Sequence, residues 1–513
     1  MEKAIKTKKK ENLQQRGYLN SLTSIIDYAG AQIIGFVVSP FVVNGLGSTL
    51  YGIWQMLSQM TGFANMADTR ASQVLKWSIA KNRDISSSEE LRAEVTSASL
   101  VTLFILPFIL VIGGAIAWYA PIITRAEQAH FQLIRIVGGL LMLSLIINKV
   151  FDIFEAVLRG MNLGYKRMGF RAGIVAIGGA SKVLVIQQGY GLIGLAVVDV
   201  ALALITALTF YYIVRAHVSW FGFGRTTKKK TVEYGKLSGW FMAFTGTKIL
   251  LFNSDKILLG YLIGPLFVTQ YTITMFATAA VQGLVYAVIN GIIPGIGSLF
   301  GKGEFEKIKK ARNLINQLNY LLIAAIGVAI LLFNHSFIQL WVGEEHFAGY
   351  LENLFILIIA VQFIFFQTDS LIINVSLDLK LKILYSSLAS LITFVLAYFL
   401  VKEYHIIGLC WSIFLGRLIL TIGYPLILKR QLSDNEKLLQ ASILRPLFVT
   451  LLFFIIATHI GRYVNVSSWA ILILLGGISV VIAGFLFWFI GLSAPGRKDL
   501  GELSSKIKLF KKD

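Results

Sequence analysis

The residues of this chain with the clearest chemical potential are charged side chains inside long apolar stretches. If those stretches cross a membrane, each buried charge costs at least about 2.5 kcal/mol and needs a partner or a water-filled cavity. Such residues therefore mark candidate transport or binding sites. The basic set is Arg135, Lys149, Lys182, Lys248, Lys256 and Arg417, and the acidic set is Asp27, Asp152, Glu155, Asp199, Asp255 and Asp369.

Four basic residues form the predicted substrate-binding set: Lys248, Lys256, Arg417 and Arg135. On a continuous helix over 236–262, Lys248 and Asp255 are seven residues apart and share one face. Lys248 and Arg417 fall near mid-membrane, whereas Arg135 and Lys256 lie toward the outside. This distribution predicts a cationic cavity that could pass an anionic group such as a diphosphate. The alternative for Asp255 and Lys256 is an ion pair that only fixes helix packing.

Three aspartates form a second candidate set for ion coupling or charge pairing. Asp27 and Asp369 have no partner nearby in the sequence, and Asp255 precedes Lys256. Carboxylates of this kind serve as proton or cation relays in transporters, but a neutral packing acid is the alternative. Lys149, Asp152 and Glu155 lie near the predicted cytoplasmic boundary, where charged side chains commonly reach the interface.

Composition shows which elements must position these residues. The 513 residues are 56% hydrophobic and 14% charged, with a mean hydropathy of +0.72, whereas soluble domains carry roughly a quarter charged residues. Unbroken apolar runs such as 101–118 and 469–490 approach the roughly 20 residues that a transmembrane helix needs. A barrel would instead alternate polar and apolar residues. The sequence predicts an all-α polytopic membrane protein.

Apolar runs between polar breaks predict about fourteen transmembrane helices. With the N-terminus in the cytoplasm, the predicted outer loops contain only Arg125, Lys402 and Arg462 of the 47 Lys and Arg residues, as the positive-inside rule requires. Both termini are therefore expected in the cytoplasm. The predicted spans are 18–43, 50–69, 94–118, 131–157, 167–187, 191–214, 236–262, 266–292, 312–333, 350–374, 382–401, 406–428, 445–461 and 468–491.

The basic loop 215–235 divides these spans into two pseudo-symmetric six-helix halves followed by two additional helices. Transporters often consist of two such repeats with the substrate site between them. A faint repeat is visible where Leu46-Gly47 and Ile263-Gly264 each follow the first span of a half. The predicted parts are the basic N-terminus 1–17, the halves 18–214 and 236–428, the additional helices 429–491 and the basic tail 492–513.

Several function classes are disfavoured. Cys410 is the single cysteine, so no disulfide framework is expected, and the net charge of +20 is explained by membrane topology rather than nucleic acid. No phosphate-binding Gly-x-x-x-x-Gly-Lys-Ser/Thr occurs, which argues against ATP hydrolysis. Without ATP hydrolysis, a proton or cation gradient or the membrane potential would drive transport, and no metal or cofactor is predicted. A membrane enzyme is the remaining alternative, because the outer loop 334–349 holds His335, Glu344, Glu345 and His346.

Short strings along the chain resemble a known family. Leu46-Gly47 followed by Tyr51-Gly52, Asp68, the string 254–260 (Ser-Asp-Lys-Ile-Leu-Leu-Gly) and the string 340–347 look like those of polysaccharide biosynthesis proteins of the oligosaccharide flippase type. That family, which includes O-antigen flippases, belongs to the multidrug/oligosaccharidyl-lipid/polysaccharide exporter (MOP) superfamily. Thr69-Arg70 after Asp68 and lysine at position 256 depart from its usual pattern, which makes residue-level transfer uncertain.

The resemblance implies translocation of a polyprenyl-diphosphate-linked oligosaccharide across the bacterial plasma (inner) membrane by alternating access. The glycan would serve O-antigen, lipopolysaccharide, capsule or related assembly, with polysaccharide-assembly proteins as expected partners beside the lipid bilayer. From the same superfamily, the alternative is a cation-coupled drug antiporter, which needs an acidic cavity. An outer-face glycan polymerase or transferase is the third hypothesis, although we expect a transporter and not an enzyme.

Overall fold

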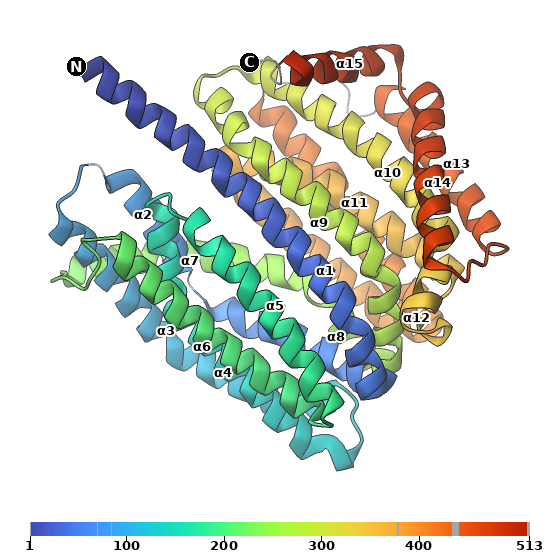
Figure 1. Ribbon diagram of the computed structural model, residues 1–513, viewed down its shortest axis with the longest axis horizontal. Coiled ribbons are helices and arrows are strands. Elements are labelled where there is room, and N and C mark those ends of the chain that lie inside the picture. Colours follow the sequence, from blue (N-terminus) through green and yellow to red (C-terminus); the bar gives the residue numbers. More distant parts are fainter. Residues whose placement is uncertain (1, 69, 84, 377–378, 433–440, 510–513) are drawn as a thin grey trace. The chain divides into compact units, whose positions relative to one another are not determined.

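The computed structural model describes residues 2–68, 70–83, 85–376, 379–432 and 441–509, with side chains described from Tyr28 onward except at scattered positions. In these ranges, the regular secondary structure is entirely helical (Figure 1). Contacts divide the chain into two compact units, Met1–Val268 and Thr269–Asp513. The division of the chain into two six-helix halves at loop 215–235 stays a prediction, because the boundary between the compact units lies elsewhere, at residues 268–269.

The first unit is built from long helices that run side by side. α4 packs against both α3 and α6, and α5 packs against α1 and α6 (Figure 1). The shorter α2 lies against α3 and α4. The helices of this unit are α1 (Glu2–Ala64), α2 (Ala71–Asn82), α3 (Ser88–Ile123), α4 (Phe131–Gly160), α5 (Tyr165–Gln187), α6 (Gly191–His217), α7 (Lys228–Phe252) and α8 (Asp255–Ile263).

In the second unit, α11 is buried along most of its length against α10, α12 and α13, and α10 also packs against α14. The C-terminal α15 contacts α10, where Leu500 joins a buried cluster with Tyr320 and Phe487. The helices are α9 (Pro265–Gly301), which begins at the end of the first unit, α10 (Phe305–Trp341), α11 (Tyr350–Ser376), α12 (Lys380–Gln431), α13 (Ala441–Gly461), α14 (Trp469–Ile490) and α15 (Ala494–Leu509).

Glycine allows the chain to break at the two positions of the faint repeat. Gly47 interrupts α1 with φ 75° and ψ 162°, and Gly264 separates α8 from α9 with φ 113° and ψ 162°. Side-chain-bearing residues rarely adopt such positive φ values, so glycine is needed at both turns. The matching backbone conformation is what an internal repeat would require at these two places.

The helices agree with most, but not all, of the predicted spans. Ten helices in the described part of the chain are long and apolar enough to cross a bilayer. Two of them are bent by non-helical residues, α1 at Gly47 and α12 at His405, where the sequence predicts separate spans. The helices α7, α8 and α9 are not among the ten, so the count of fourteen stays a prediction.

The predicted single span 236–262 is wrong in one respect, because the structure interrupts it. α7 ends at Phe252 and α8 begins at Asp255. The backbone of Asn253 departs from helical values at φ −118° and ψ 13°, and the Ser254 hydroxyl donates a hydrogen bond of 2.7 Å to the Leu250 carbonyl. Hydropathy did not reveal this break, since two small polar residues hardly change the average of the apolar run.

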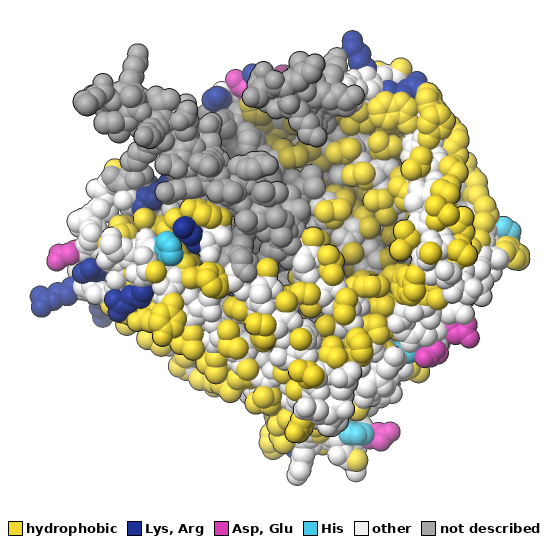
Figure 2. Space-filling model, in the orientation of Figure 1, with side chains coloured by type: hydrophobic (Ala, Val, Ile, Leu, Met, Phe, Trp, Pro, Cys, Tyr) yellow, Lys and Arg dark blue, Asp and Glu magenta, His cyan; other side chains and the backbone are white. Residues whose placement is uncertain are grey.

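The outer face of the helices is apolar. Large side chains such as Phe104, Val111 and Ile473 are each 72% exposed, and hydrophobic side chains cover much of the visible face (Figure 2). A soluble protein rarely exposes such broad apolar surface, whereas lipid is its natural solvent. The chain is therefore a multi-pass membrane protein.

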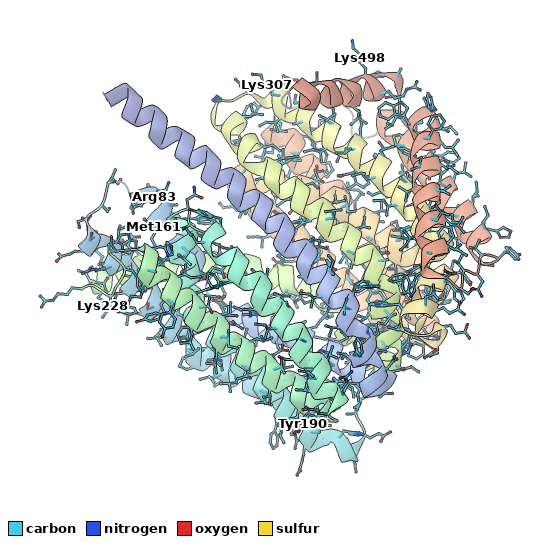
Figure 3. All side chains as sticks on the ribbon, in the orientation of Figure 1. Arg83, Met161, Tyr190, Lys228, Lys307 and Lys498 are labelled. Carbon is cyan, nitrogen blue, oxygen red and sulfur yellow. The ribbon has the colours of Figure 1, made fainter. Side chains whose placement is uncertain are left out.

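Within each unit, the predicted cytoplasmic segments lie at a common end. Arg83, Met161 and Lys228 lie at one end of the first unit and Tyr190 at the other (Figure 3). Lys307 and Lys498 share one end of the second unit (Figure 3). This is the arrangement that alternation of the predicted loops requires inside each unit.

The two legs of α12 approach closely through glycine. A Cβ atom at Gly416 would lie 2.8 Å from the Ala389 carbonyl oxygen and 3.0 Å from the Thr393 nitrogen, both backbone atoms of the other leg. Small residues are favoured at membrane-helix interfaces because they permit such contacts.

We expect Gly416→Val to destabilise the second unit, because backbone atoms cannot move aside for the new methyl groups. Overpacking typically costs about 1–3 kcal/mol. The control is Gly476→Val in α14, where a Cβ atom has no neighbour within 4 Å. Thermal unfolding in detergent should show a lower Tm for Gly416→Val alone, and equal Tm values for the two variants would contradict the close packing of the legs.

Candidate functional site

The break between α7 and α8 holds the central candidate residues of the first unit. Asp255 and Lys256 occupy the first turn of α8, where the positive end of the helix dipole favours a carboxylate. Lys256 is half-buried, and its Nζ donates a hydrogen bond of 2.9 Å to Oε1 of Gln55 in α1. α1 passes the break closely, because a Cβ atom at Gly62 would clash with Asn253. Transporters commonly place binding sites at such broken helices.

Lys248 does not share one continuous helical face with Asp255, which corrects the expectation from their spacing. It lies in α7, whereas Asp255 begins α8 beyond the interruption at residues 253–254. The Lys248 side chain is exposed. Of the predicted cationic residues of this unit, Lys256 is thus the one held at the break.

A second basic side chain borders the same leg of α1. Lys182 in α5 pairs with Asp199 in α6 at 2.7 Å, and its Nζ lies 5.8 Å from the ring centre of Trp54. Trp54 directly precedes Gln55, the partner of Lys256. The leg of α1 after Gly47 therefore contacts lysines from α5 and α8, a grouping that the sequence did not reveal.

Arg135 has a different environment from Lys256. Its guanidinium lies 3.9 Å from the ring centre of Trp118, and its Nε donates a hydrogen bond of 3.2 Å to the Trp118 carbonyl. Both residues belong to the adjoining ends of α3 and α4. A cation stacked on tryptophan near a helix end is typical of an anchor at the membrane surface.

Lys149 and Asp152, interpreted above as interfacial charges, belong to a network centred on Asp68. The Nζ of Lys149 lies 2.8 Å from Oδ2 of Asp68 and 3.3 Å from Oδ2 of Asp152. Arg70 adds a backbone N–H bond of 3.0 Å to Asp68. This network joins the end of α1 to α4, and the one signal for it was Asp68 in the family-like string.

Asp369 of α11 has a partner that sequence reasoning missed. Arg312 of α10 donates two hydrogen bonds to it, from Nε to Oδ1 at 2.6 Å and from Nη2 to Oδ2 at 2.7 Å. The Asp369 side chain is 5% exposed. The bidentate geometry matches the charge-pairing alternative, because two parallel charge-assisted hydrogen bonds are the typical arginine–carboxylate pair.

Two further basic residues are buried in the second unit. Lys382, 2% exposed, donates hydrogen bonds to the Ser370 carbonyl at 2.9 Å and to Oδ1 of Asn374 at 2.5 Å. Arg417 is buried, with its guanidinium 5.9 Å from the ring centre of Phe366. The sequence analysis predicted Arg417 as a residue within a span. It placed Lys382 at the boundary of the span 382–401, because hydropathy alone does not show whether a lysine at a helix end is buried or exposed.

The structure says less about the remaining candidate residues, Asp27 and the histidines and glutamates of the outer loop. The Asp27 side chain lies outside the described residues. In the outer loop, Nδ1 of His346 lies 3.3 Å from Oε1 of Glu345, and the His335 ring packs against Phe347 and Tyr350. No three His, Cys, Asp or Glu side chains in the described ranges come together in a way that could hold a metal ion. The loop therefore has the character of a packed aromatic corner.

The fold, with its helical units, broken helices and buried charges, resembles the folds of solved membrane transporters. The structure of the lipid II flippase MurJ in its inward closed conformation matches with a TM-score of 0.65 and 13% identity, covering 91% of this chain and 98% of that one. An inward-facing multidrug resistance MATE family transporter of the MOP superfamily matches with a TM-score of 0.57 and 13% identity, covering 80% and 94%.

A further match is the MATE transporter VcmN of Vibrio cholerae in its bent form, with a TM-score of 0.54, 15% identity and coverage of 83% and 97%. No protein-family model and no curated protein sequence matches the chain. At these identities, the likeness establishes the fold, and the substrate must be argued from the residues.

Breaking the Arg312–Asp369 pair is expected to destabilise the second unit strongly. Arg312→Gln or Asp369→Asn alone should cost about 3–5 kcal/mol, because either change leaves a buried group without its charged partner. The double variant should be more stable than the sum of the single effects implies, with a coupling energy on the order of 1–3 kcal/mol.

The matched control is the exposed pair Lys307–Glu304 at 2.8 Å, where Lys307→Gln should change stability by less than about 1 kcal/mol. Chemical unfolding of the wild type and these four variants in detergent measures the differences. Strict additivity of the two buried substitutions would show that the pair does not hold α10 to α11.

Proposed function

We propose that this protein is a flippase that moves a polyprenyl-diphosphate-linked oligosaccharide across the bacterial plasma membrane, for O-antigen, capsule or related polysaccharide assembly. The observation that carries the proposal is the environment of Lys256. This ammonium group lies at a helix break inside an apolar protein, and its hydrogen bond goes to the neutral amide oxygen of Gln55. The Asp255 carboxylate in the same turn also attracts the ammonium, but the hydrogen bond itself goes to a neutral group, so the cation can still attract phosphate oxygens.

Other buried basic groups support the same substrate class. Lys182 borders the same leg of α1, and in the second unit Lys382 and Arg417 contact carbonyl, amide and aromatic groups. Phosphate is recognised through several charge-assisted hydrogen bonds, and lysine and arginine both supply them. The lipid tail would stay in the bilayer while these groups receive the diphosphate.

The competing functions fit the same residues less well. A cation-exporting antiporter needs acidic side chains for its cargo, yet Asp369 is neutralised by Arg312 and Asp68 by Lys149. The flippase MurJ structure also covers 91% of this chain, against 80% and 83% for the two MATE structures described above. A membrane enzyme would rely on the outer loop, where His335 packs against aromatic rings.

The transport cycle in this proposal is alternating access without a chemical step by the protein. The turns at Gly47 and Gly264 are compatible with helices that move as rigid legs. We further propose that the chain crosses the membrane fourteen times with both termini in the cytoplasm. A cation gradient or the membrane potential would drive transport, and polysaccharide-assembly proteins would be its partners.

The test measures translocation of a fluorescent polyprenyl-diphosphate oligosaccharide between leaflets of proteoliposomes. Lys256→Ala should lower the rate by about tenfold or more, since one charge-assisted hydrogen bond contributes about 1.5–3 kcal/mol. Lys256→Arg should retain most of the rate. The control is Lys498→Ala, which removes an exposed charge in α15 and should leave transport unchanged.

Folded wild-type protein that moves no such lipid, but exchanges organic cations for protons or sodium, would establish the antiporter instead. If Lys256→Ala transported the lipid at an unchanged rate, the α7–α8 break would not be part of the substrate pathway.

A further inference from the structure

A group of buried oxygen atoms in the first unit has no role in the proposed substrate pathway. It lies between α2, α3 and α7, at the end of the unit where Arg83 and Lys228 are found (Figure 3). Its members are Glu94 of α3, with 6% exposure, and Tyr234 and Ser238 of α7, with 6% and 0%. Tyr234 and Ser238 are four residues apart, so they lie on one helical face.

Within the described part of the chain, Oε2 of Glu94 and the Ser238 hydroxyl have no hydrogen-bond partner, and the Tyr234 hydroxyl meets Ser78 without a hydrogen bond of good geometry. The other Glu94 oxygen, Oε1, accepts a hydrogen bond of 3.1 Å from the Asn82 amide, which also lies 3.3 Å from the Ser78 hydroxyl. Each unsatisfied buried polar atom costs about 1–3 kcal/mol, so a group of such poorly satisfied oxygens points to a bound species.

The neighbouring groups define the charge of that species. Burial and the nearby Glu94 carboxylate raise the pKa of the Tyr234 phenol, so this hydroxyl stays neutral. Glu94 then supplies one full negative charge among neutral oxygens. Carboxylate and hydroxyl oxygens suit hard cations, and a single carboxylate suits a single positive charge.

We propose that Glu94, Tyr234 and Ser238 bind a small monovalent cation such as Na⁺. Ser78 adds a hydroxyl oxygen, and the Asn82 amide can turn its oxygen toward the cation, because the two ends of an amide have nearly the same shape. This site is independent of the proposed substrate, since none of its residues contacts Lys256 or Lys182 through a described hydrogen bond or ion pair.

Lys230 is the built-in competitor of the cation. Its Nζ lies 3.8 Å from Oε1 of Glu94 and donates a hydrogen bond of 3.4 Å to the Glu90 carbonyl, while its side chain is 35% exposed. A cation that binds Glu94 would displace this ammonium toward solvent. The other charged group facing this region, Arg92, is engaged elsewhere, with its Nε 2.7 Å from the Trp220 carbonyl.

The site is attached to the loop between the predicted halves. Thr96 and Ser97, on the turn of α3 after Glu94, bind Gly224 and Thr226 of that loop at 2.9 Å and 2.7 Å. Release of Lys230 by a cation would therefore loosen the start of α7 while the loop stays fastened to α3. In this way, the site couples cation binding to the position of α7.

The experiment measures binding of radioactive sodium ions to the purified full-length protein in detergent by scintillation proximity. The wild type should bind saturably. Glu94→Gln should abolish binding, and Tyr234→Phe, which keeps the ring in its cluster with Leu75 and Val95, should weaken it on the order of tenfold. The exposed Glu89 of the same helix provides the control Glu89→Gln, with unchanged binding.

Lys230→Gln gives the opposite and sharper result. Removal of the competing ammonium should tighten sodium binding severalfold, whereas Lys229→Gln, an exposed neighbour, should not change it. A purely structural role for the cluster would not produce tighter binding. Absence of saturable sodium binding in the folded wild type, or binding insensitive to Glu94→Gln, would overturn the proposal whatever lipid the protein transports.

Discussion

The cost of holding charge in an apolar interior governs how this protein is assembled. Several described ion pairs join separate helices: Arg312–Asp369 holds α10 to α11, Lys182–Asp199 holds α5 to α6, and Lys149–Asp68 holds α4 to the segment that follows α1. Apolar surfaces in lipid slide past one another with little penalty, but a separated charge pair does not. These pairs therefore specify which helices are neighbours and in what register.

Interruptions of the helices have a different effect from the ion pairs, since they leave backbone polar groups accessible beside the candidate substrate site. Gly47 and Gly264 turn the chain between consecutive helices, and Asn253-Ser254 divides α7 from α8 beside Lys256. At each break, backbone groups lose their intrahelical partners and must be satisfied locally, as the Ser254 hydroxyl does for the Leu250 carbonyl. The candidate substrate and cation sites thus differ in origin, one at a break and one between intact helices.

The sequence predicted the helical membrane class, most helix positions and the turn at Gly47, because hydropathy and glycine act locally. It could not predict the break at 253–254, since the surrounding apolar run hides two polar residues. Arg312 and Lys382 were assigned to cytoplasmic boundaries, because burial there depends on which helices pack against them. Glu94 was overlooked for the same reason: its surroundings come from α2 and α7, which are distant in the sequence. Pairing of charges is a tertiary property that one-dimensional patterns do not contain.

The stacking of Arg135 on Trp118 has a consequence for the membrane itself. As a membrane-surface anchor, this pair would hold one end of α3 and α4 at the lipid headgroups, while Arg83 and Lys228 lie at the end of the unit opposite Tyr190. The apolar distance between these two levels is set by covalent helix length and is hard to compress. A bilayer of unequal thickness must then deform around the unit or tilt it, at a cost of fractions of a kcal/mol per Å. The length of the lipid acyl chains would thereby influence which conformations the protein adopts.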